Sequence, residues 1–341
     1  MSDKPAVSGG RAGIRQVAEQ AGVGIASVSR VLSGQPGVSP KMAERVLEAA
    51  RQLGYMPNVM AQSLRRRSTR SIGFVCSDIT NPLLASIVSG AESVLSAAGF
   101  SILLTNSGGQ AEVDAQRIEV LLQRQVDGLI LLPALEDDAA TLAALQRSET
   151  PCVVIDRSMP ASLVTDAVLS DHYAGVGEAA GYLLDNGHRR LGLVVGRDVR
   201  PSRERIRAVR NAFETRGLVE DLIIESGTLS VEHGAHALER LLSDAQPPSA
   251  IILGGNQLLE GALAVIKQRN VTLGKQLSLV CCDDVPLSRL HEPPIATVQR
   301  DTALLGKRAA ERLLQQLDER QPHAEDVLPT WFEWRASCAP R

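Results

Sequence analysis

Short aliphatic segments alternate with helical segments through most of this 341-residue chain, and this alternation constrains its fold more than any other feature. The segments are apolar at consecutive positions, as in parallel strands that are buried on both faces of a sheet. Aromatic residues make up only 3% of the sequence, so the core must be aliphatic. The expected strands are Ile72–Cys76, Ser101–Thr105, Gly128–Leu132, Cys152–Ile155, Ala167–Ser170, Arg190–Val195, Leu222–Ser226, Ala250–Leu253 and Leu277–Cys281.

Helices are expected between these strands, among them Pro82–Ala98, Ala111–Gln125 and Ala139–Ser148. The pattern predicts a doubly wound α/β arrangement with parallel sheets that occurs twice, as two similar lobes. Ligands of such sheets bind at the carboxyl ends of the strands. Two lobes that face each other would therefore place a ligand site in the cleft between them.

The first 71 residues differ in charge from the rest of the chain. They hold eleven Lys or Arg against four Asp or Glu, a net charge of +7, whereas the remaining residues carry a net charge of −10. A basic head on an acidic body indicates that the head has a polyanion as its partner. The alternative is a cationic tail that only aids solubility, but these charges lie on a patterned helical segment.

Three short helices are predicted in the head. Ile14–Gln20 is amphipathic, Ala21–Gly24 is a turn of small residues, and Ile25–Leu32 is a second helix that carries serines and one arginine. Ser39–Pro40 begins a third helix as its N-cap and first helical position, and Gly54 ends it. Helix, turn and helix in this order predict a DNA-binding helix-turn-helix.

The exposed face of the second helix is the predicted DNA-reading surface. Ile25 and Ala26 lie at its N-terminal tip, where side chains reach base edges. Arg30 can donate to O6 and N7 of a guanine, a contact worth about 1–3 kcal/mol of discrimination. Ser27, Ser29 and Ser33 suit phosphate oxygens, which set the register, or they are merely solvated.

A second DNA contact is predicted just after the head. Asn58 can cap a short helix that ends in the arginine run Arg65–Arg67. Leu64 stands beside these charges, so it has little core to join and could wedge between base pairs from the minor groove. Such a short segment is marginal alone and should become helical on DNA.

Several motifs resemble the lactose/galactose repressor (LacI–GalR) family of bacterial transcription regulators. They occur in family order: IRQVAEQAGVGIASVSRVL, VSPKMAERVLEAARQLGYMPN, AQSLR, SIGFVCSDITNPLLASIVSGAE, VDGLIL, PCVVID, NGHRRLGLV and CCDDVPLS followed by PPIATVQRD. The chain departs from the family at Gly24, Ser27 and Ser33, and Ile25 and Ala26 replace the polar pair that reads bases in well-known members. The operator sequence therefore cannot be carried over.

The resemblance implies an all-α helix-turn-helix domain followed by a two-lobed, periplasmic-binding-protein-like α/β core. The expected divisions are a disordered N-terminus at 1–12, the DNA-binding domain at 13–56, a hinge helix and linker at 57–70, and the effector-binding core at 71–341. Lobe 1 would span about 71–168 and 299–328, and lobe 2 about 169–298 and 329–341. The DNA contacts implied are Ile25, Ala26, Ser27, Ser29, Arg30, Ser33, Asn58, Gln62, Leu64 and Arg65.

The family positions that contact a small effector fall on polar residues at the ends of strands. They are Ser77, Asp78, Asp156, Arg205, Asn256 and Asp283. Leu229 stands where sugar-binding members often have a stacking aromatic, which argues against a stacked pyranose. With Arg157, Arg203 and Arg205 nearby, the hypothesis is a small sugar acid or a similar anion.

The resemblance also implies the assembly and the switch. The family dimerises through the body, and Pro82–Leu95 is the matching segment, while no leucine heptad follows the C-terminal TWFEWRASCAPR. We therefore expect a homodimer on a palindromic double-stranded DNA operator, most simply a repressor. A sugar, a sugar acid or a related metabolite would change the relation of the lobes and hence operator binding.

Two other classes of protein share parts of this pattern. A periplasmic solute-binding protein or a sensor without a gene-regulatory role would share the body but not the basic head. An enzyme could use the pair Asp283 and Asp284, but no GxSxG, Walker, HExxH or GxGxxG motif is present, so we expect no enzyme. Cys281 and Cys282 lack zinc spacing and read as buried strand-end residues, so neither metal nor cofactor is expected. An odd cysteine count, no signal peptide and no long apolar run favour a cytoplasmic protein without a membrane partner.

Overall fold

The computed structural model describes residues 12–32, 37–55, 68–319 and 321–340. It divides into two compact units, a head that covers Met1–Thr69 and a body that covers Arg70–Arg341. No helix of the described residues is long and apolar enough to cross a membrane. The predicted hinge helix lies outside the described residues.

The head consists of three helices around a small aliphatic core. They are α1 (Ile14–Ala21), α2 (Ile25–Leu32) and α3 (Pro40–Gln52). The core residues are Val17, Ala18, Ala21, Val28, Val46, Ala49 and Ala50. As predicted, Ser39 caps α3 through its hydroxyl, which accepts from the Met42 amide, and Pro40 occupies the first helical position.

The turn between α1 and α2 depends on Gly22 and Arg45. Gly22 adopts a left-handed conformation with a φ of 61°, which favours glycine. The Arg45 guanidinium on α3 donates to the carbonyl groups of Ala21 and Gly22. A Cβ on Gly22 would lie 2.9 Å from the Arg45 Nη2, so a larger residue would also displace this guanidinium. The turn therefore holds α2 at a set angle to α1 and α3.

Lobe 1 of the body contains a six-stranded sheet in the order β11-β5-β4-β3-β1-β2, and all of its strands are parallel. The strands are β1 (Ser71–Cys76), β2 (Ser101–Asn106), β3 (Gly128–Leu131), β4 (Cys152–Ile155), β5 (Asp166–Ser170) and β11 (Glu325–Leu328). Helices α5 (Pro82–Ala97) and α13 (Thr302–Asp318) cover one face, and α6 (Ala111–Gln123) and α7 (Ala139–Gln146) cover the other.

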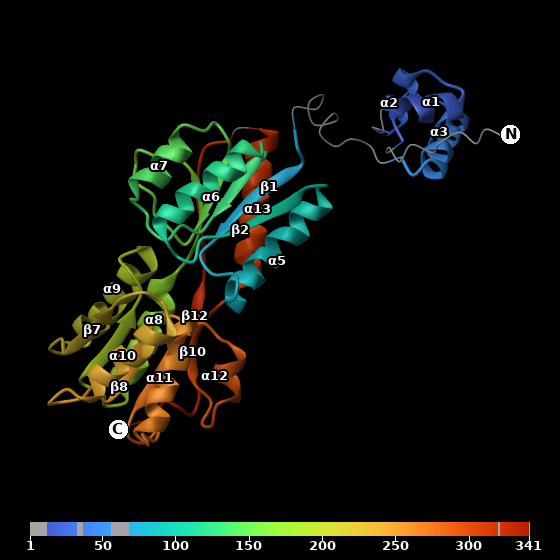
Figure 1. Cartoon of the computed structure of the whole chain (residues 1–341). Helices are drawn as coiled ribbons and strands as arrows, with labels where there is room; N and C mark the ends of the chain where they lie inside the picture. Colours follow the sequence, from blue (N-terminus) through green and yellow to red (C-terminus); the bar gives the residue numbers. More distant parts are fainter. Residues whose placement is uncertain (1–11, 33–36, 56–67, 320, 341) are drawn as a thin grey trace. The chain divides into compact units, whose positions relative to one another are not determined.

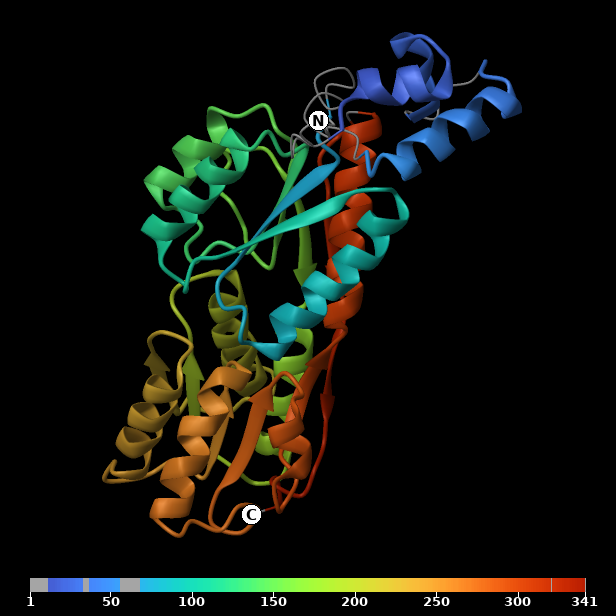
Figure 2. The same ribbon diagram turned by 45° about the vertical axis from the view of Figure 1, so that its right-hand side comes forward.

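Lobe 2 repeats this plan with the order β12-β10-β9-β8-β6-β7. Its strands are β6 (Leu191–Val195), β7 (Leu222–Ser226), β8 (Ala250–Leu253), β9 (Ser278–Cys282), β10 (Ala296–Arg300) and β12 (Thr330–Glu333). Helices α8 (His172–Asp185) and α9 (Arg200–Glu214) cover one face, and α10 (Val231–Leu242) and α11 (Asn256–Gln268) cover the other. The short α12 (Pro286–Leu290) follows β9. In Figures 1 and 2, lobe 1 of the body lies above lobe 2.

In each lobe, two helices pack closely because a glycine on each helix faces the backbone of the other. In lobe 1, a Cβ on Gly306 of α13 would lie 1.8 Å from the Ile87 carbonyl oxygen of α5, and one on Gly90 would lie 2.1 Å from the Ala303 carbonyl oxygen. Gly234 and Gly261 have the same role between α10 and α11 in lobe 2. The backbones can pack this closely only without side chains at these positions.

The structure confirms the two-lobed α/β fold and differs from the expected strands in details. Three C-terminal strands were not predicted as strands, and β12 runs antiparallel to β10 in an otherwise parallel sheet. The strand expected at Leu277–Cys281 begins one residue later, so Cys282 belongs to β9. The chain passes between the sheets after β5, after β10 and between β11 and β12.

Candidate functional site

The outer edge of α2 is the candidate DNA-reading surface of the head. Val28 is buried against α1 and α3, whereas Ile25 is 44% exposed at the tip of the helix. Ala26 and Arg30 are also exposed, and Ser27 and Ser29 are half-buried. The core of the head therefore turns one edge of α2 outward. The remaining predicted DNA contacts, Ser33, Asn58, Gln62, Leu64 and Arg65, lie outside the described residues.

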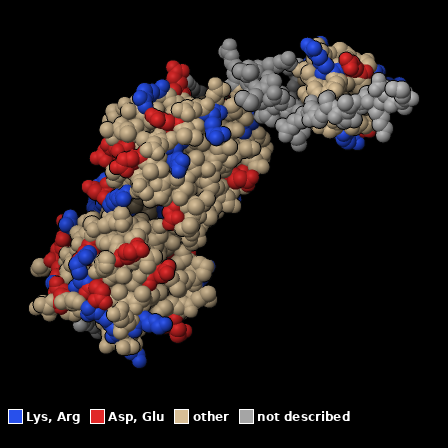
Figure 3. Space-filling model, viewed as in Figure 1, with Lys and Arg blue, Asp and Glu red and all other residues tan. Residues whose placement is uncertain are grey.

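A cavity of about 400 Å³ lies between the two lobes of the body. Lobe 1 contributes Ser77, Asp78, Gly108, Gly109, Ala134 and Arg157, and lobe 2 contributes Gly196, Arg197, Val199, Pro201, Ser202, Arg205, Thr228, Leu229 and Gln257. The space-filling view shows the surface hollowed where the lobes meet (Figure 3). Its volume is that of a site for a small metabolite.

Hydrogen bonds join the lobes at several places around this cavity. Gln257 donates through Nε2 to the Asp78 Oδ2 at 2.8 Å, and Asn256 donates through Nδ2 to the Asn81 Oδ1 at 3.1 Å. On the other side, Glu136 accepts from the Arg200 amide at 2.8 Å. These bonds hold the lobes in the arrangement that the structure shows.

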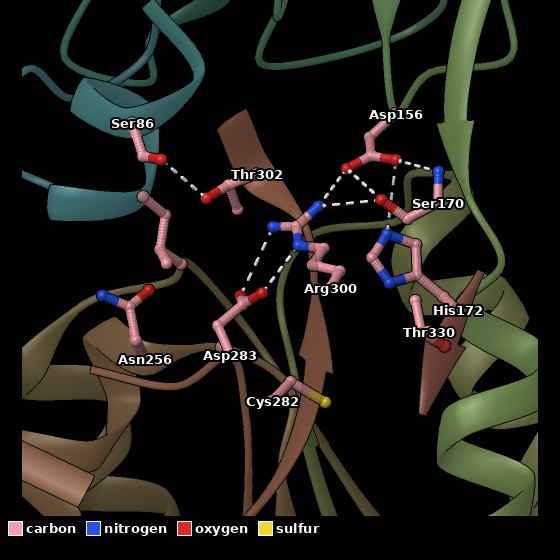
Figure 4. A network of polar contacts seen from close by, with 12 residues as sticks. Ser86, Asp156, Ser170, His172, Asn256, Cys282, Asp283, Arg300, Thr302 and Thr330 are labelled. Atoms are coloured by element: carbon pink, nitrogen blue, oxygen red, sulfur yellow. Dashed lines mark hydrogen bonds and ion pairs between the residues drawn. The ribbon is translucent and has the colours of Figure 1, made fainter. Parts of the chain in front are cut away.

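A buried ion network lies beside the cavity, at the point where the chain crosses between the lobes (Figure 4). Arg300, the last residue of β10, donates through Nε to the Asp283 Oδ1 at 2.6 Å and through Nη1 to the Asp156 carboxylate. Asp156 also accepts from the Ser170 amide at 2.6 Å. Burial raises the pKa of Asp156, but the Arg300 guanidinium outweighs it and holds this pKa well below its usual range. Asp156 is therefore ionised, and both carboxylates are paired with Arg300.

Asp156 and Asp283 occupy equivalent positions in the two lobes. Each follows the strand that precedes the crossing strand, β4 before β5 in lobe 1 and β9 before β10 in lobe 2. Each has a left-handed backbone, with φ values of 52° and 72°. The Asp156 amide donates to the Val168 carbonyl, and the Asp283 amide to the Val298 carbonyl. Aspartate tolerates this conformation better than most residues, and strain of this kind gathers at functional sites.

His172 connects this network to the cavity. Its Nδ1 accepts from the Arg205 Nη2 at 3.3 Å, so the ring proton lies on Nε2, which is 3.5 Å from the Asp156 Oδ1. Burial, with the Arg205 charge adding to it, lowers the pKa of His172 to about 4. The imidazole is therefore neutral at pH 7 and places no second cation beside Asp156.

Comparison with known proteins agrees with this architecture. Residues 13–58 match the bacterial regulatory proteins of the lacI family, and residues 180–338 match the periplasmic binding protein-like domain. The chain belongs to the lacI family of bacterial regulatory proteins. This match over the head removes the alternative of a solute-binding protein without a regulatory role.

Relatives of this lacI-family regulator match it over most of its length. The ribose operon repressor of Haemophilus influenzae is 29% identical over 89% of this chain and 91% of its own. The lac repressor dimer bound to operator and the anti-inducer ONPF is 26% identical with a TM-score of 0.86, covering 97% of this chain and all of that one. The transcriptional regulator CelR in complex with cellobiose is 28% identical with a TM-score of 0.72, covering 96% of this chain and all of that one.

The structure brings some of the predicted effector residues of the regulator together and separates others. Ser77, Asp78 and Arg205 line the cavity. Asp156 and Asp283 face Arg300 instead, and Asn256 faces Asn81 of lobe 1. These six assignments remain predictions.

Arg203, which its place in the sequence groups with the effector arginines, does not line this cavity. Its side chain pairs with Glu136 of lobe 1 at 2.5 Å and with Asp198 of lobe 2 at 3.1 Å, and it lines a neighbouring depression on lobe 2. The reason is helical geometry, since Arg203 and Arg205 are two positions apart on α9 and point in different directions.

Arg197, Gln257 and Arg300 were missed in the sequence. Arg197 comes two residues after β6 ends, so the strand-end rule that selected Asp78 could have found it. Gln257 lies next to Asn256 in the first turn of α11. Arg300 closes a strand that the sequence did not reveal, and nothing in its neighbourhood marked it as the partner of two distant aspartates.

Proposed function

We propose that this regulator is a repressor that binds a palindromic DNA operator as a homodimer and is switched by a small effector between its lobes. One observation carries the proposal. The same chain has a helix, α2, whose N-terminal end is exposed, and a cavity that is lined by residues of both lobes. Two of the relatives named above are repressors, one of them bound to operator, and the third is a transcriptional regulator bound to a sugar. A cytoplasmic location follows from this role.

The geometry suggests how the switch works. An effector in the cavity would contact Asp78 of lobe 1 and Arg205 of lobe 2 at once, and so compete with bonds such as that from Gln257 to Asp78. A ligand shifts an equilibrium between two lobe arrangements only by its differential affinity for them. A coupling of about 1–3 kcal/mol is enough for a 5- to 150-fold change in operator affinity.

Dimerisation is proposed through α5. Its inward face, with Leu84, Ile87 and Leu95, is buried against the sheet and α13. Its exposed residues include Ala85, Ser89 and Ser96, which are small enough to let a second helix approach, and Glu92. Light scattering at micromolar concentration should give a dimer, and a tetramer or a monomer would contradict this assembly.

An enzymatic role is not proposed. Asp283 and Asp284 are the carboxylate pair that an enzyme could use, but both are engaged in ion pairs. Asp283 pairs with Arg300, and Asp284 pairs with Arg289 and Arg335 at 2.8 Å each. Carboxylates held in this way are poor bases and nucleophiles.

Selection from a random pool of double-stranded DNA tests the main proposal. The full chain should enrich an inverted repeat, because a dimer places two α2 helices on two-fold related half-sites. Leu64→Ala should weaken binding to the selected operator and leave effector affinity unchanged, as expected for a minor-groove wedge. Arg51→Ala, on the exposed face of α3, is the control. Enrichment of no motif, or of a single unrepeated half-site, would overturn the proposal.

A further inference from the structure

Three arginines in the wall of the inter-lobe cavity lack carboxylate partners. Arg157 belongs to lobe 1, and Arg197 and Arg205 belong to lobe 2. Arg157 donates to the Pro133 carbonyl at 2.7 Å and to the Asp156 carbonyl at 2.9 Å, and Arg197 donates to the Gly109 carbonyl. Carbonyl groups orient a guanidinium but leave its charge in place. Within the described part of the chain, none of the three forms an ion pair with an acid.

Arg205 is the least satisfied of the three. It is only 4% exposed, and its Nε is buried with no hydrogen-bond partner in the part of the chain that the structure describes. Its guanidinium donates to the neutral ring of His172 and also contacts the Cys282 thiol, so it has no anionic partner among the described residues. A buried cation with an unused donor is costly until an acceptor reaches it, and an acceptor that carries negative charge stabilises it most.

Acidic side chains behind the cavity wall stabilise the Arg157 cation, but none of them forms an ion pair with it. Asp78 is the one acid that lines the cavity among the described residues, against three arginines. Asp156 and Asp283, whose carboxylates could accept bonds from sugar hydroxyls, are both engaged by Arg300 (Figure 4). A neutral, hydroxyl-rich ligand would therefore meet few free acceptors, whereas an anion would meet three cationic donors.

The backbone on the lobe 1 side also suits an anion. Gly108 and Gly109 line the cavity in succession with φ values of 64° and 68°. Neither amide has an acceptor among the described residues. Successive amides in turn conformations form concavities that bind anions. Leu229, Val199 and Pro201 give the opposite wall an apolar part.

We propose that the effector is a small anion whose carboxylate or phosphate group is bound by Arg157, Arg197 and Arg205. This rests on the proposed function of the cavity as the effector site, and it narrows the effector from small metabolites in general to anionic ones. The cavity of about 400 Å³ accommodates a molecule of the size of a sugar acid or a sugar phosphate.

Calorimetric titration of the full chain with inorganic phosphate tests the charge of the site without knowledge of the natural effector. Wild-type protein should show a saturable one-to-one component, which Arg197→Gln weakens about tenfold or more and Arg197→Lys largely retains. The matched control is Arg240→Gln, which removes an exposed, ion-paired arginine of α10 and should leave the component unchanged. Phosphate that binds the head or other surfaces contributes equally to all variants.

The proposal is overturned if wild-type protein shows no saturable phosphate component, or if Arg197→Gln and Arg157→Gln keep it in full. Thermal melting of each variant shows that a lost component does not reflect an unfolded body.

A second titration shows whether the anionic group is a carboxylate or a phosphate. It also tests the charge of the effector separately from the proposed switch. The probes are ribose, ribonate and ribose 5-phosphate, each with and without the selected operator. Tighter binding of ribonate or of ribose 5-phosphate than of ribose supports the inference and identifies a carboxylate or a phosphate. Tight binding of ribose that survives Arg197→Gln and alters operator affinity would refute the anionic class and retain the switch. Failure to enrich an operator would refute the switch while the phosphate titration still tests the cavity.

Discussion

Arg300→Gln removes the cation that pairs with two buried carboxylates, and the structure gives the size of the effect. The Arg300 side chain is 13% exposed, and those of Asp156 and Asp283 are 6% exposed each. Glutamine can replace at most one or two of the donated hydrogen bonds and none of the charge. Removal of one partner from a buried ion pair costs about 3–5 kcal/mol, because the remaining charge is poorly solvated. We therefore expect the free energy of unfolding of the body to fall by about 4 kcal/mol at pH 7.

The pH dependence has a defined sign. The folded-state pKa of Asp156 lies well below its usual range, so the ion pair contributes stability above the unfolded-state pKa, about 3.9, and loses it as the pH falls through the folded-state pKa. The difference between wild type and Arg300→Gln should therefore be full at pH 7 and should shrink below about pH 4.

Urea unfolding followed by tryptophan fluorescence measures this difference. The two tryptophans, Trp331 and Trp334, both lie in the body, so the signal does not include the head. The control is Arg147→Gln, which breaks an exposed pair with Glu119 and should cost less than about 1 kcal/mol. The reasoning is refuted if Arg300→Gln is no more destabilising than this control at pH 7, or if its deficit persists undiminished at pH 3.

Three further predictions concern packing, titration and DNA. Gly306→Ala should lower the free energy of unfolding by about 2 kcal/mol or more, because the added methyl meets the backbone of α5. Gly177→Ala, which has open space at its Cβ, should be neutral or stabilising, and calorimetric melting compares the two variants. The pKa of His172 is lowered to about 4, so its contribution to the free energy of unfolding is complete above pH 6.5, and about 3 kcal/mol of it is lost as the pH falls toward 4. The urea midpoint of wild type should drop more over this range than that of His172→Gln, and equal drops would contradict the shift. Arg30→Ala should flatten preference at one base pair per half-site, by about 1–3 kcal/mol, in anisotropy titrations of single-base operator variants; a uniform loss would assign Arg30 to phosphate instead.

Which strands the sequence revealed depends on where they lie in the sheets. Central strands such as β8 are buried at every position and appear as continuous apolar runs. β11 and β12 lie at sheet edges, where exposed and buried side chains alternate and charges such as Glu325 and Glu333 are tolerated. Their sequences therefore lack the run that identified the others, and the antiparallel direction of β12 had no local signal.

The sequence by itself determined the helix-turn-helix head, the two α/β lobes and the lacI family, because helix caps, turn glycines and apolar periodicity act between near neighbours in the chain. Only the tertiary structure decided how the charges pair. Asp156, Asp283 and Arg300 meet because three strands from two lobes end at one place. This pairing leaves Arg157, Arg197 and Arg205 at the cavity without ion-pair partners among the described residues. Electrostatic energy depends on distance in space and on burial, and neither can be read from distance along the chain.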